Sequence, residues 1–263
     1  MDTLPSNLHI STMVQIGRMK TNIILSELSE NLSINDTIKY IEYRSQISKG
    51  EKATQNNGKR KSTAENKQKK NFFYNQVTVH VMDTKRVNTK IFNNGRIQMT
   101  GIKTEEQGER VMNILLKEFI NISSDKKEKI FDNHDIKLDE YIETVLINTD
   151  FDINYQVDRE TLHRFIVDRG YYSSYEPCTY PGVNIKYYHN SNNDNFGICN
   201  CEKPCNGKGK GTSCKRITIA VFNSGKIIIT GGRNKNNIIT AYNFITNILN
   251  SNKELFEIKE LIE

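Results

Sequence analysis

Four of the five cysteines in this 263-residue chain lie within sixteen positions and could together bind a metal ion. They are Cys199, Cys201, Cys205 and Cys214. Four thiolates can close a tetrahedral zinc site and order the loop that carries them, here residues 189–215, which are rich in Asn, Gly and Cys. The spacing differs from the paired CxxC of standard zinc motifs, so free thiols in a flexible loop remain the alternative. Disulfides are the least expected state in a reducing compartment. Cys178 stands apart, and we expect it to be structural or on the surface.

The remaining residue types show no pattern typical of catalysis. The five His are scattered instead of set at ligand spacing, and neither a Walker motif nor GxSxG is present, so we expect no enzymatic activity and no required cofactor. No stretch approaches the roughly 18 apolar residues that span a membrane. The start, MDTLPSNLHI, lacks the basic and apolar regions of a secretion signal. These observations predict a soluble, intracellular protein.

Positive charge is concentrated in one stretch. The formal net charge is only +6, yet nine Lys or Arg fall between Arg44 and Lys70, against Glu51 and Glu65. Such a cluster suggests contact with phosphate or another anionic surface. The alternative is a solvated, disordered basic insertion at residues 44–70, which follows from its composition of Lys, Asn, Gln, Ser, Thr and Gly.

An internal repeat in the sequence indicates which secondary-structure elements would position these cysteines and basic residues. KIFNNGRIQMTGIK at residues 90–103 returns as AVFNSGKIIITGGR at residues 220–233, an offset of 130 positions at which six residues are identical. Arg96 and Lys226 keep a positive charge at one matching position. A single long offset is the signature of a duplicated domain, so we expect two halves related by an approximate two-fold axis.

Each copy predicts a β-hairpin followed by a helix. An Asn-Asn-Gly or Asn-Ser-Gly turn separates two β-rich runs, the second of which ends at Thr-Gly. Thr104 and Gln107 then have capping-box spacing in the first copy, and Asn234 is the expected cap in the second. Helices that cover one face of a sheet leave alternate residues on the free face. These are Phe92, Asn94, Arg96, Gln98 and Thr100 in the first copy, and Phe222, Ser224, Lys226, Ile228 and Thr230 in the second.

Both halves predict the same order of elements: strand, helix, four strands, helix. The predicted parts are a first repeat at residues 1–122, a charged connector at 123–141, a second repeat at 142–250 and a tail at 251–263. In the second repeat, Asp158 should cap the helix that follows the first strand, and Gly170 should end it.

The two hairpins and one further motif resemble a known family. The paired [IV]-F-N-x-G-[KR]-I-x-x-T-G hairpins, the TEEQ helix start and SSYEP-xx-YPG at residues 173–182 are similar to the saddle domain of the TATA-box-binding protein. The resemblance covers roughly residues 8–250 apart from the two insertions and the connector. It implies an α+β fold, a pseudo-two-fold saddle of curved antiparallel sheet with helices on the convex face. Abundant Asn, Lys and Ile indicate an AT-rich genome, and a divergent member from such a genome or from a large DNA virus would work in the nucleus or at a cytoplasmic replication site.

The resemblance implies a transcription initiation factor whose concave face binds and bends A·T-rich promoter DNA through the minor groove. Apolar wedges kink the duplex. An apolar face that carries a few Thr, Asn and Ser donors favours A·T over G·C, because an A·T pair presents only acceptors in the minor groove. Phe92 and Phe222 match one wedge in each half, and Tyr180 matches the second wedge of the second half. Its counterpart in the first half is expected at Phe73, although strict counting back from Phe92 reaches Asn75.

Further contacts follow from the same resemblance. Arg86 and Arg216 match phosphate-contacting arginines, Lys186 falls at a further basic position, and Thr100 and Thr230 match minor-groove threonines. The implied protein partners are a transcription-factor-B-like bridging factor, for which Glu176 matches a contact carboxylate, and the RNA polymerase machinery.

Several positions depart from the family pattern. His9 and Thr144 stand where the family has a central pair of Asn, and Gln98 replaces an apolar residue that faces the groove. Cys178 and Thr179 stand where the family has an acidic residue and a leucine beside the bridging-factor contact. The alternative function is therefore a degenerate saddle-fold module that binds proteins without sequence-specific DNA binding.

Overall fold

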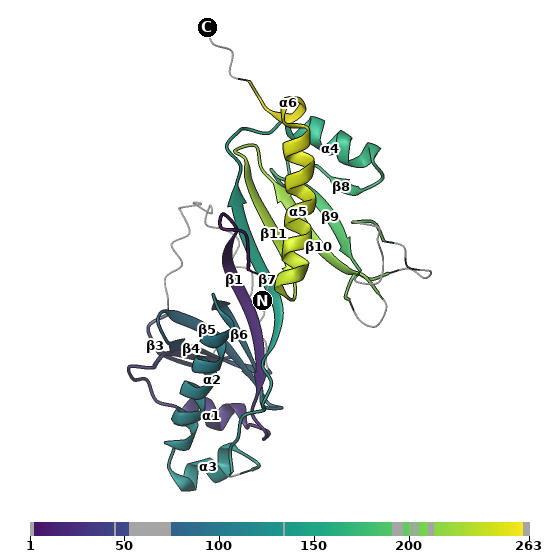
Figure 1. The fold of residues 1–263 in the computed structure, drawn as a ribbon. Helices are drawn as coiled ribbons and strands as arrows, with labels where there is room; N and C mark the ends of the chain where they lie inside the picture. The colour runs from purple at the N-terminus through teal and green to yellow at the C-terminus, as the bar shows by residue number, and fades with distance from the viewer. Residues whose placement is uncertain are drawn as a thin grey trace. The chain divides into compact units, whose positions relative to one another are not determined.

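The protein forms two compact units in a computed structural model that describes residues 3–44, 46–52, 75–133, 135–190, 197–199, 201, 205–209 and 213–259. One unit comprises Val14–Glu143, and the other comprises Met1–Met13 together with Thr144–Glu263. Strand β1 (His9–Arg18) contributes residues to both units. Figure 1 shows the elements of each unit.

The Val14–Glu143 unit contains an antiparallel sheet with the strand order β3-β2-β4-β5-β6. The strands are β2 (Ile38–Tyr43), β3 (Ile47–Gly50), β4 (Gln76–Met82), β5 (Arg86–Phe92) and β6 (Arg96–Ile102). Buried and half-exposed side chains alternate along β5 and β6, as expected when one face of a sheet packs on a core. Register pairs Val77 with Ile91 and Ile91 with Ile97, so these buried residues form one row across the sheet.

Helices cover the buried face of this sheet. They are α1 (Leu25–Asn31), α2 (Glu105–Ile120) and α3 (Ser124–Ile130), and Figure 1 shows α2 lying across the strands. The buried stripe of α2 includes Val111, Leu115 and Phe119, at the spacing of one helix face. The Thr104 side chain accepts a hydrogen bond from Gln107 N, which confirms the predicted cap.

The other unit repeats this plan with the strand order β7-β11-β10-β9-β8. Its strands are β7 (Glu143–Asp152), β8 (Tyr172–Ser174), β9 (Val183–His189), β10 (Lys215–Val221) and β11 (Lys226–Gly232). Its helices are α4 (Arg159–Asp168), α5 (Lys235–Ser251) and α6 (Lys253–Phe256), with α5 lying across β9, β10 and β11 (Figure 1). Asp158 and Asn234 cap α4 and α5 as predicted, and Gly170 follows α4 with φ +79°.

The repeated Asn-x-Gly turns are held against the segment that follows the first strand of their own repeat. Gly95 and Gly225 have φ of +76° and +84°, which favours glycine. A Cβ atom on Gly95 would lie 2.4 Å from the carbonyl oxygens of Met19 and Thr21, and one on Gly225 would lie 2.4 Å from that of Tyr155. The Asn-Gly signal therefore reflects a close backbone approach as well as a turn conformation.

Three elements were not predicted from the sequence. Strand β3 occupies residues 47–50 of the expected disordered insertion 44–70, because Ile47–Gly50 pairs with β2; residues 53–70 of that insertion lie outside the described residues. Helix α3 lies within the expected charged connector, where buried Ile130 and Phe131 anchor it. Helix α6 lies within the expected tail, because Phe256 is buried edge-on against Phe165.

Candidate nucleic-acid interface and cysteine cluster

Each sheet has a face that the helices do not cover, which we call its open face. In the unit that contains β7–β11, cross-strand register places its side chains in two rows. The rows are Asn184–Ala220–Ile228–Asp150 and Lys186–Thr218–Thr230–Asn148. All except Ala220 are half-exposed, so this face is a mixture of apolar, hydroxyl and amide groups. Asn184, Asn148 and Asp150 were missed by sequence reasoning, which followed only the repeated hairpin.

The open face of the Val14–Glu143 unit is more polar. Its rows are Thr78–Lys90–Gln98 and His80–Asn88–Thr100. Lys90 and Gln98 stand where the other repeat has Ala220 and Ile228, so a basic and an amide group replace two apolar ones. The His80 ring lies 5.0 Å from that of Tyr40, and burial, followed by the nearby Arg86 and Lys52 charges, lowers its pKa.

Tyr180 and Phe222 form an aromatic pair, as the wedge hypothesis requires. Their ring centroids are 5.8 Å apart at 60°, Tyr180 is 38% exposed and Phe222 is half-exposed. Gly182 makes room for them, because a Cβ atom there would lie 2.9 Å from the Tyr180 ring and 3.2 Å from the Phe222 ring. Two aromatic rings therefore remain partly open to solvent beside the Asn-Ser-Gly turn.

Phe92 occupies the matching position in the other repeat and is also half-exposed. Phe73, its expected partner, lies outside the described residues. The register of the strands gives a second way to find the position equivalent to Tyr180. Val77 pairs with Ile91 in one repeat as Val183 pairs with Val221 in the other. Tyr180 precedes Val183 by three positions. The same count from Val77 reaches position 74, a tyrosine, whereas the strict count gave Asn75, which is exposed.

The expected phosphate contacts have different surroundings. Arg86 Nη1 donates to the Glu51 carbonyl at 2.9 Å, so a residue of the expected basic insertion already engages this side chain. Lys186 Nζ donates to Thr218 Oγ1 at 3.0 Å, and burial together with the Arg216 charge lowers the pKa of Lys186. Arg216 is exposed at the start of β10. Arg86 and Arg216 thus lie at the starts of β5 and β10.

Lys226 is paired with two carboxylates. Its Nζ lies 2.9 Å from Asp150 Oδ2 and 3.9 Å from Asp152 Oδ2. The hydrogen bond to Asp150 raises the pKa of Lys226. Since one cation faces two anions, this corner of the open face has no excess positive charge. Arg96, the equivalent of Lys226, is exposed at the start of β6.

Asn94 and Ser224 serve the hairpin turns. Asn94 Oδ1 accepts from Arg96 N at 3.2 Å, and Ser224 Oγ accepts from Lys226 N at 3.4 Å. Such side chain to backbone bonds are typical of turn residues, which explains their place in the repeat.

The SSYEP segment forms a turn after β8. The Glu176 carbonyl accepts hydrogen bonds from Thr179 N at 2.9 Å and Tyr180 N at 2.8 Å. Arg159 is placed over the Tyr175 ring at 5.4 Å from its centroid and bonds the Pro181 carbonyl. The side chains of Glu176 and Cys178 are exposed, so this turn presents a carboxylate to solvent.

The four clustered cysteines are brought together. Their Sγ atoms all lie within 4.8 Å of one another. The distances from Cys214 Sγ are 3.5 Å to Cys201 Sγ and 3.8 Å to Cys199 Sγ. Burial and the neighbouring thiols raise the pKa of Cys214 to about 12, since thiolates repel when no cation lies among them. Cys178 is not part of this group.

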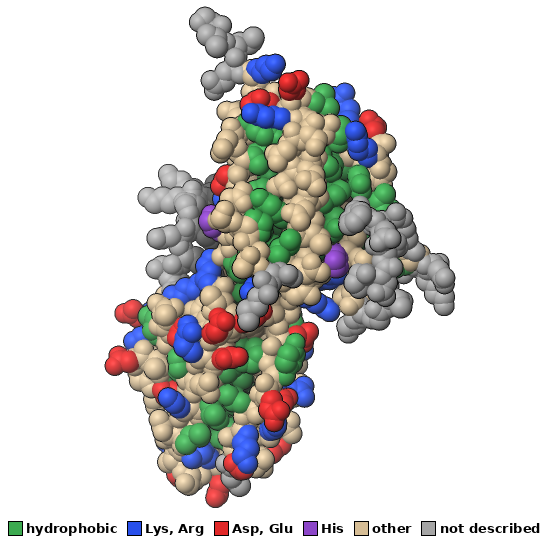
Figure 2. Space-filling view, viewed as in Figure 1, with side chains coloured by type: hydrophobic (Ala, Val, Ile, Leu, Met, Phe, Trp, Pro, Cys, Tyr) green, Lys and Arg blue, Asp and Glu red, His purple; other side chains and the backbone are tan. Residues whose placement is uncertain are grey.

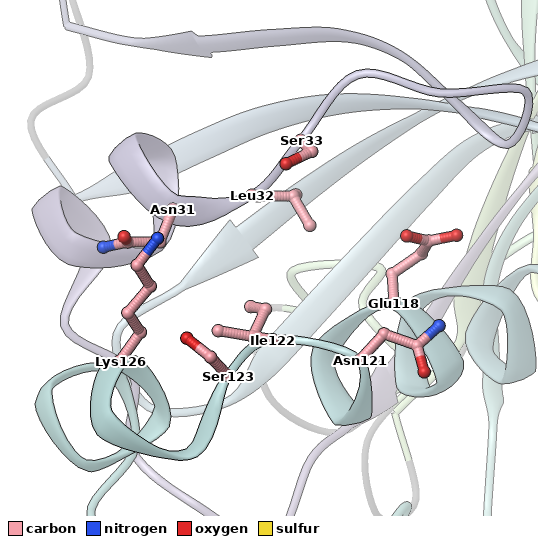
Figure 3. Close-up of a pocket in the computed structure, with 8 residues that line it drawn as sticks. All are labelled: Asn31, Leu32, Ser33, Glu118, Asn121, Ile122, Ser123 and Lys126. Carbon is pink, nitrogen blue, oxygen red and sulfur yellow. The ribbon is translucent and has the colours of Figure 1, made fainter.

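The hollow shown in Figure 3 lies among Asn31, Ser33, Glu118 and Lys126. Glu118 accepts hydrogen bonds from Asn35 Nδ2 at 2.8 Å and from Thr37 Oγ1 at 2.6 Å, and it therefore stabilises the segment that leads into β2. Figure 2 shows interspersed acidic and basic side chains on the helix-bearing side of the Val14–Glu143 unit, whereas α5 has Lys235 as its single charged residue. Among the described residues, no helix is both long and apolar enough to cross a membrane.

Comparisons with known proteins agree with this geometry. The family described as "Transcription factor TFIID (or TATA-binding protein, TBP)" matches residues 145–252. A "TATA-box-binding protein-like" protein of Acanthamoeba polyphaga mimivirus is 32% identical over 198 residues, which are 67% of this chain and 48% of that protein. The chain thus spans about half the length of this curated relative. The structure of Methanococcus jannaschii TBP matches with a TM-score of 0.54 at 17% identity, covering 94% of this chain and 99% of that one.

The fold is therefore the α+β saddle fold of the TATA-binding protein. Together with the match to the family model, this makes the chain a divergent TATA-binding-protein-like protein.

Proposed function

We propose that the protein binds A·T-rich promoter DNA in the minor groove and bends it, using the open faces of both units. The observation that carries this proposal is the Tyr180–Phe222 pair, two aromatic rings left partly exposed at the edge of an open face. Exposure of such rings to water is unfavourable unless a partner covers them, and unstacked base steps offer a flat apolar surface that can do so. Phe92 supplies the equivalent ring in the other repeat.

The composition of the open face suits A·T pairs. Thr218, Thr230 and Asn148 lie in one row. The minor groove of an A·T pair presents acceptors alone, so hydroxyl and amide N–H groups can donate to it while Ile228 covers the sugar edges. A G·C pair would add a guanine amine, which could find no partner in the apolar Ala220 and Ile228 of the neighbouring row.

For the protein partners, we propose a bridging factor that docks on the turn after β8, with Glu176 as one contact, and so recruits RNA polymerase. The exposed carboxylate and the ordered backbone of that turn support this proposal. The nearly uncharged outer side of α5 suits a second transcription factor, because interface centres are depleted in charge.

One observation favours the alternative, a saddle-fold module that binds proteins. Asp150 and Asp152 bring two carboxylates to the open face, where they occupy Lys226. Carboxylates repel the phosphate backbone, whereas a basic protein ligand would be attracted by them.

A duplex titration separates the two functions. Fluorescence anisotropy with A·T-rich and G·C-rich duplexes, at a stated salt concentration, should show tighter binding to the A·T-rich duplex, and energy transfer between end labels should report a bend. The Phe92→Ala/Phe222→Ala variant should lose most of the bend, because unstacking of a base step then lacks its wedge. Tyr141→Ala is the matched control, since Tyr141 is 73% exposed in the segment before β7. Equal binding to both duplexes, or an unchanged bend in the double variant, would contradict the proposal.

A further inference from the structure

We propose that the segment between β9 and β10 holds one structural zinc ion, bound by the thiolates of Cys199, Cys201, Cys205 and Cys214. Each of these residues offers one Sγ atom, and the four atoms lie within 4.8 Å of one another. None of the four lies in a described helix or strand, so no shared element brings them together for another reason.

The distances fit tetrahedral zinc. With Zn–S bonds of about 2.3 Å, the sulfurs of a regular tetrahedron lie about 3.8 Å apart. Cys214 Sγ lies 3.8 Å from Cys199 Sγ and 3.5 Å from Cys201 Sγ. A disulfide requires about 2.05 Å between sulfurs, so these pairs are not bonded to each other. Four sulfur ligands in this arrangement select zinc over magnesium or calcium, which prefer oxygen.

Groups around the cysteines are placed to stabilise bound thiolates. Gly207 N donates to Cys205 Sγ at 3.3 Å, and Asn190 Nδ2 lies 3.8 Å from Cys214 Sγ as a donor. Hydrogen bonds to ligand atoms of this kind orient them and tune the metal site. A zinc ion with four thiolates carries a net charge of about −2. Lys215 follows Cys214 directly in the chain and forms a β-bridge with Lys208, so two basic residues flank the cluster along the backbone.

Backbone hydrogen bonds also join the segments that carry the cysteines to β9 and to the start of β10. Arg216 N donates to Gly207 O at 2.9 Å, and Gly209 N donates to Cys214 O at 3.0 Å, so residues 207–209 run beside the start of β10. Gly197 O accepts from Tyr188 N at 3.0 Å near the end of β9. These bonds hold Cys199, Cys205 and Cys214 near one another, and a zinc ion would link the ends of β9 and β10.

Metal content and spectroscopy test the site on the full chain. Protein purified without chelator should contain one zinc per chain by mass spectrometric metal analysis. Cobalt(II) added to the metal-free protein should give the intense visible absorption of tetrahedral four-sulfur coordination, and zinc should displace it. Cys205→Ser and Cys214→Ser should each lower zinc affinity at least tenfold. Because Cys214 is fully buried and its variant could unfold, Cys205→Ser, at a half-exposed position, gives the decisive comparison.

Cys178→Ser is the matched control, since Cys178 is exposed and outside the cluster. It should keep one zinc per chain. Alkylation of the native protein should modify Cys178 alone, and alkylation after chelation should modify all five cysteines. The proposal would be overturned if the protein contained no metal, or iron in place of zinc. It would also be overturned if the protein mass showed disulfides, or if Cys205→Ser bound zinc as tightly as the parent.

Discussion

At the scale of residues, Lys226 shows how a matching position can acquire a different electrostatic role. Arg96 and Lys226 keep one charge across the repeat, but Lys226 alone faces Asp150 and Asp152. Direct register pairs Lys226 with Asp152 and places Asp150 one row further along β7. A cation shared by two carboxylates attracts phosphate less than a free one, so the two repeats should contribute unequally to DNA affinity.

Removing the two carboxylates tests this inequality. The Asp150→Asn/Asp152→Asn variant should bind DNA several-fold more tightly, by about 1 kcal/mol, because two charges that repel phosphate are gone and Lys226 is released. The gain should be similar on all duplexes, and the dependence of affinity on salt should steepen by about one unit. Anisotropy titrations at several salt concentrations would measure both quantities.

Asp168→Asn is the control for this experiment, since Asp168 is an exposed carboxylate at the end of α4. It removes a negative charge from the helix-bearing side and should leave affinity almost unchanged. Weaker binding by the Asp150→Asn/Asp152→Asn variant would show that the carboxylates position the open face instead of opposing the phosphates.

Sequence reasoning placed the residues of the repeated hairpin on the open face. Ile228 and Thr230 follow from alternation along β11, and Phe222 lies just before the turn that leads to this strand. Asn184 and Asp150 were missed because a position on a neighbouring strand depends on register, and register is fixed by long-range pairing. The same holds for the cysteines, whose spacing permits a cluster but does not specify distances among sulfurs.

At the scale of elements, the two Asn-x-Gly turns are more tightly constrained than isolated hairpin turns. Ile23 N donates to Asn93 O at 2.7 Å, and Val157 N donates to Asn223 O at 2.8 Å. The turn of each repeat is thus hydrogen-bonded to the segment after that repeat's first strand. Glycine at Gly95 and Gly225 is required by this contact.

This contact predicts that replacement by alanine lowers the free energy of unfolding by different amounts at two glycines with similar backbone conformations. Gly95→Ala should lower the free energy of unfolding by about 3 kcal/mol or more, because a Cβ atom would lie 2.4 Å from two backbone carbonyls. Gly101→Ala should cost only about 1 kcal/mol, because Gly101 has φ +95° but no atom within 4 Å of the added Cβ. Urea unfolding of both variants measures the difference. Equal losses would mean that backbone conformation alone accounts for the glycine.

The elements predicted well are the long or strongly patterned ones. Helices α2, α4 and α5 have apolar stripes and side-chain caps, which are local signals. Strand β3 and helices α3 and α6 are short, and their formation depends on tertiary contacts such as those of buried Phe131 and Phe256. A polar stretch rich in Lys, Asn and Ser can therefore begin with a strand such as β3 when the edge of a sheet, here β2, is available for pairing.

At the scale of the whole molecule, the cysteine segment and the turn after β8 both belong to the unit with β7–β11, and we expect them to act on the same partner. Replacing residues 190–213 with Asn-Gly would restore a short hairpin between β9 and β10. This variant should bind DNA within about twofold of the parent yet recruit the cognate bridging factor at least tenfold less well, a loss of about 1.4 kcal/mol. A supershift titration with that factor would measure recruitment.

Glu176→Gln in the full-length chain provides the comparison, because it changes the proposed contact without shortening the loop. Both variants should show reduced recruitment with retained DNA binding. Normal recruitment by the shortened variant would show that the cysteine segment has no part in the contact.

The division of β1 between two units has a consequence for the order in which the protein folds during synthesis. Val14–Glu143 is continuous, so this unit can fold once Glu143 has left the ribosome. Met1–Met13 emerges before this unit but belongs with Thr144–Glu263, which emerges after it. At ordinary rates of translation this segment waits on the order of ten seconds for its partners. Its buried Leu8 and Met13 are exposed for that time, which leaves this segment open to chaperones or proteases while the protein is being made.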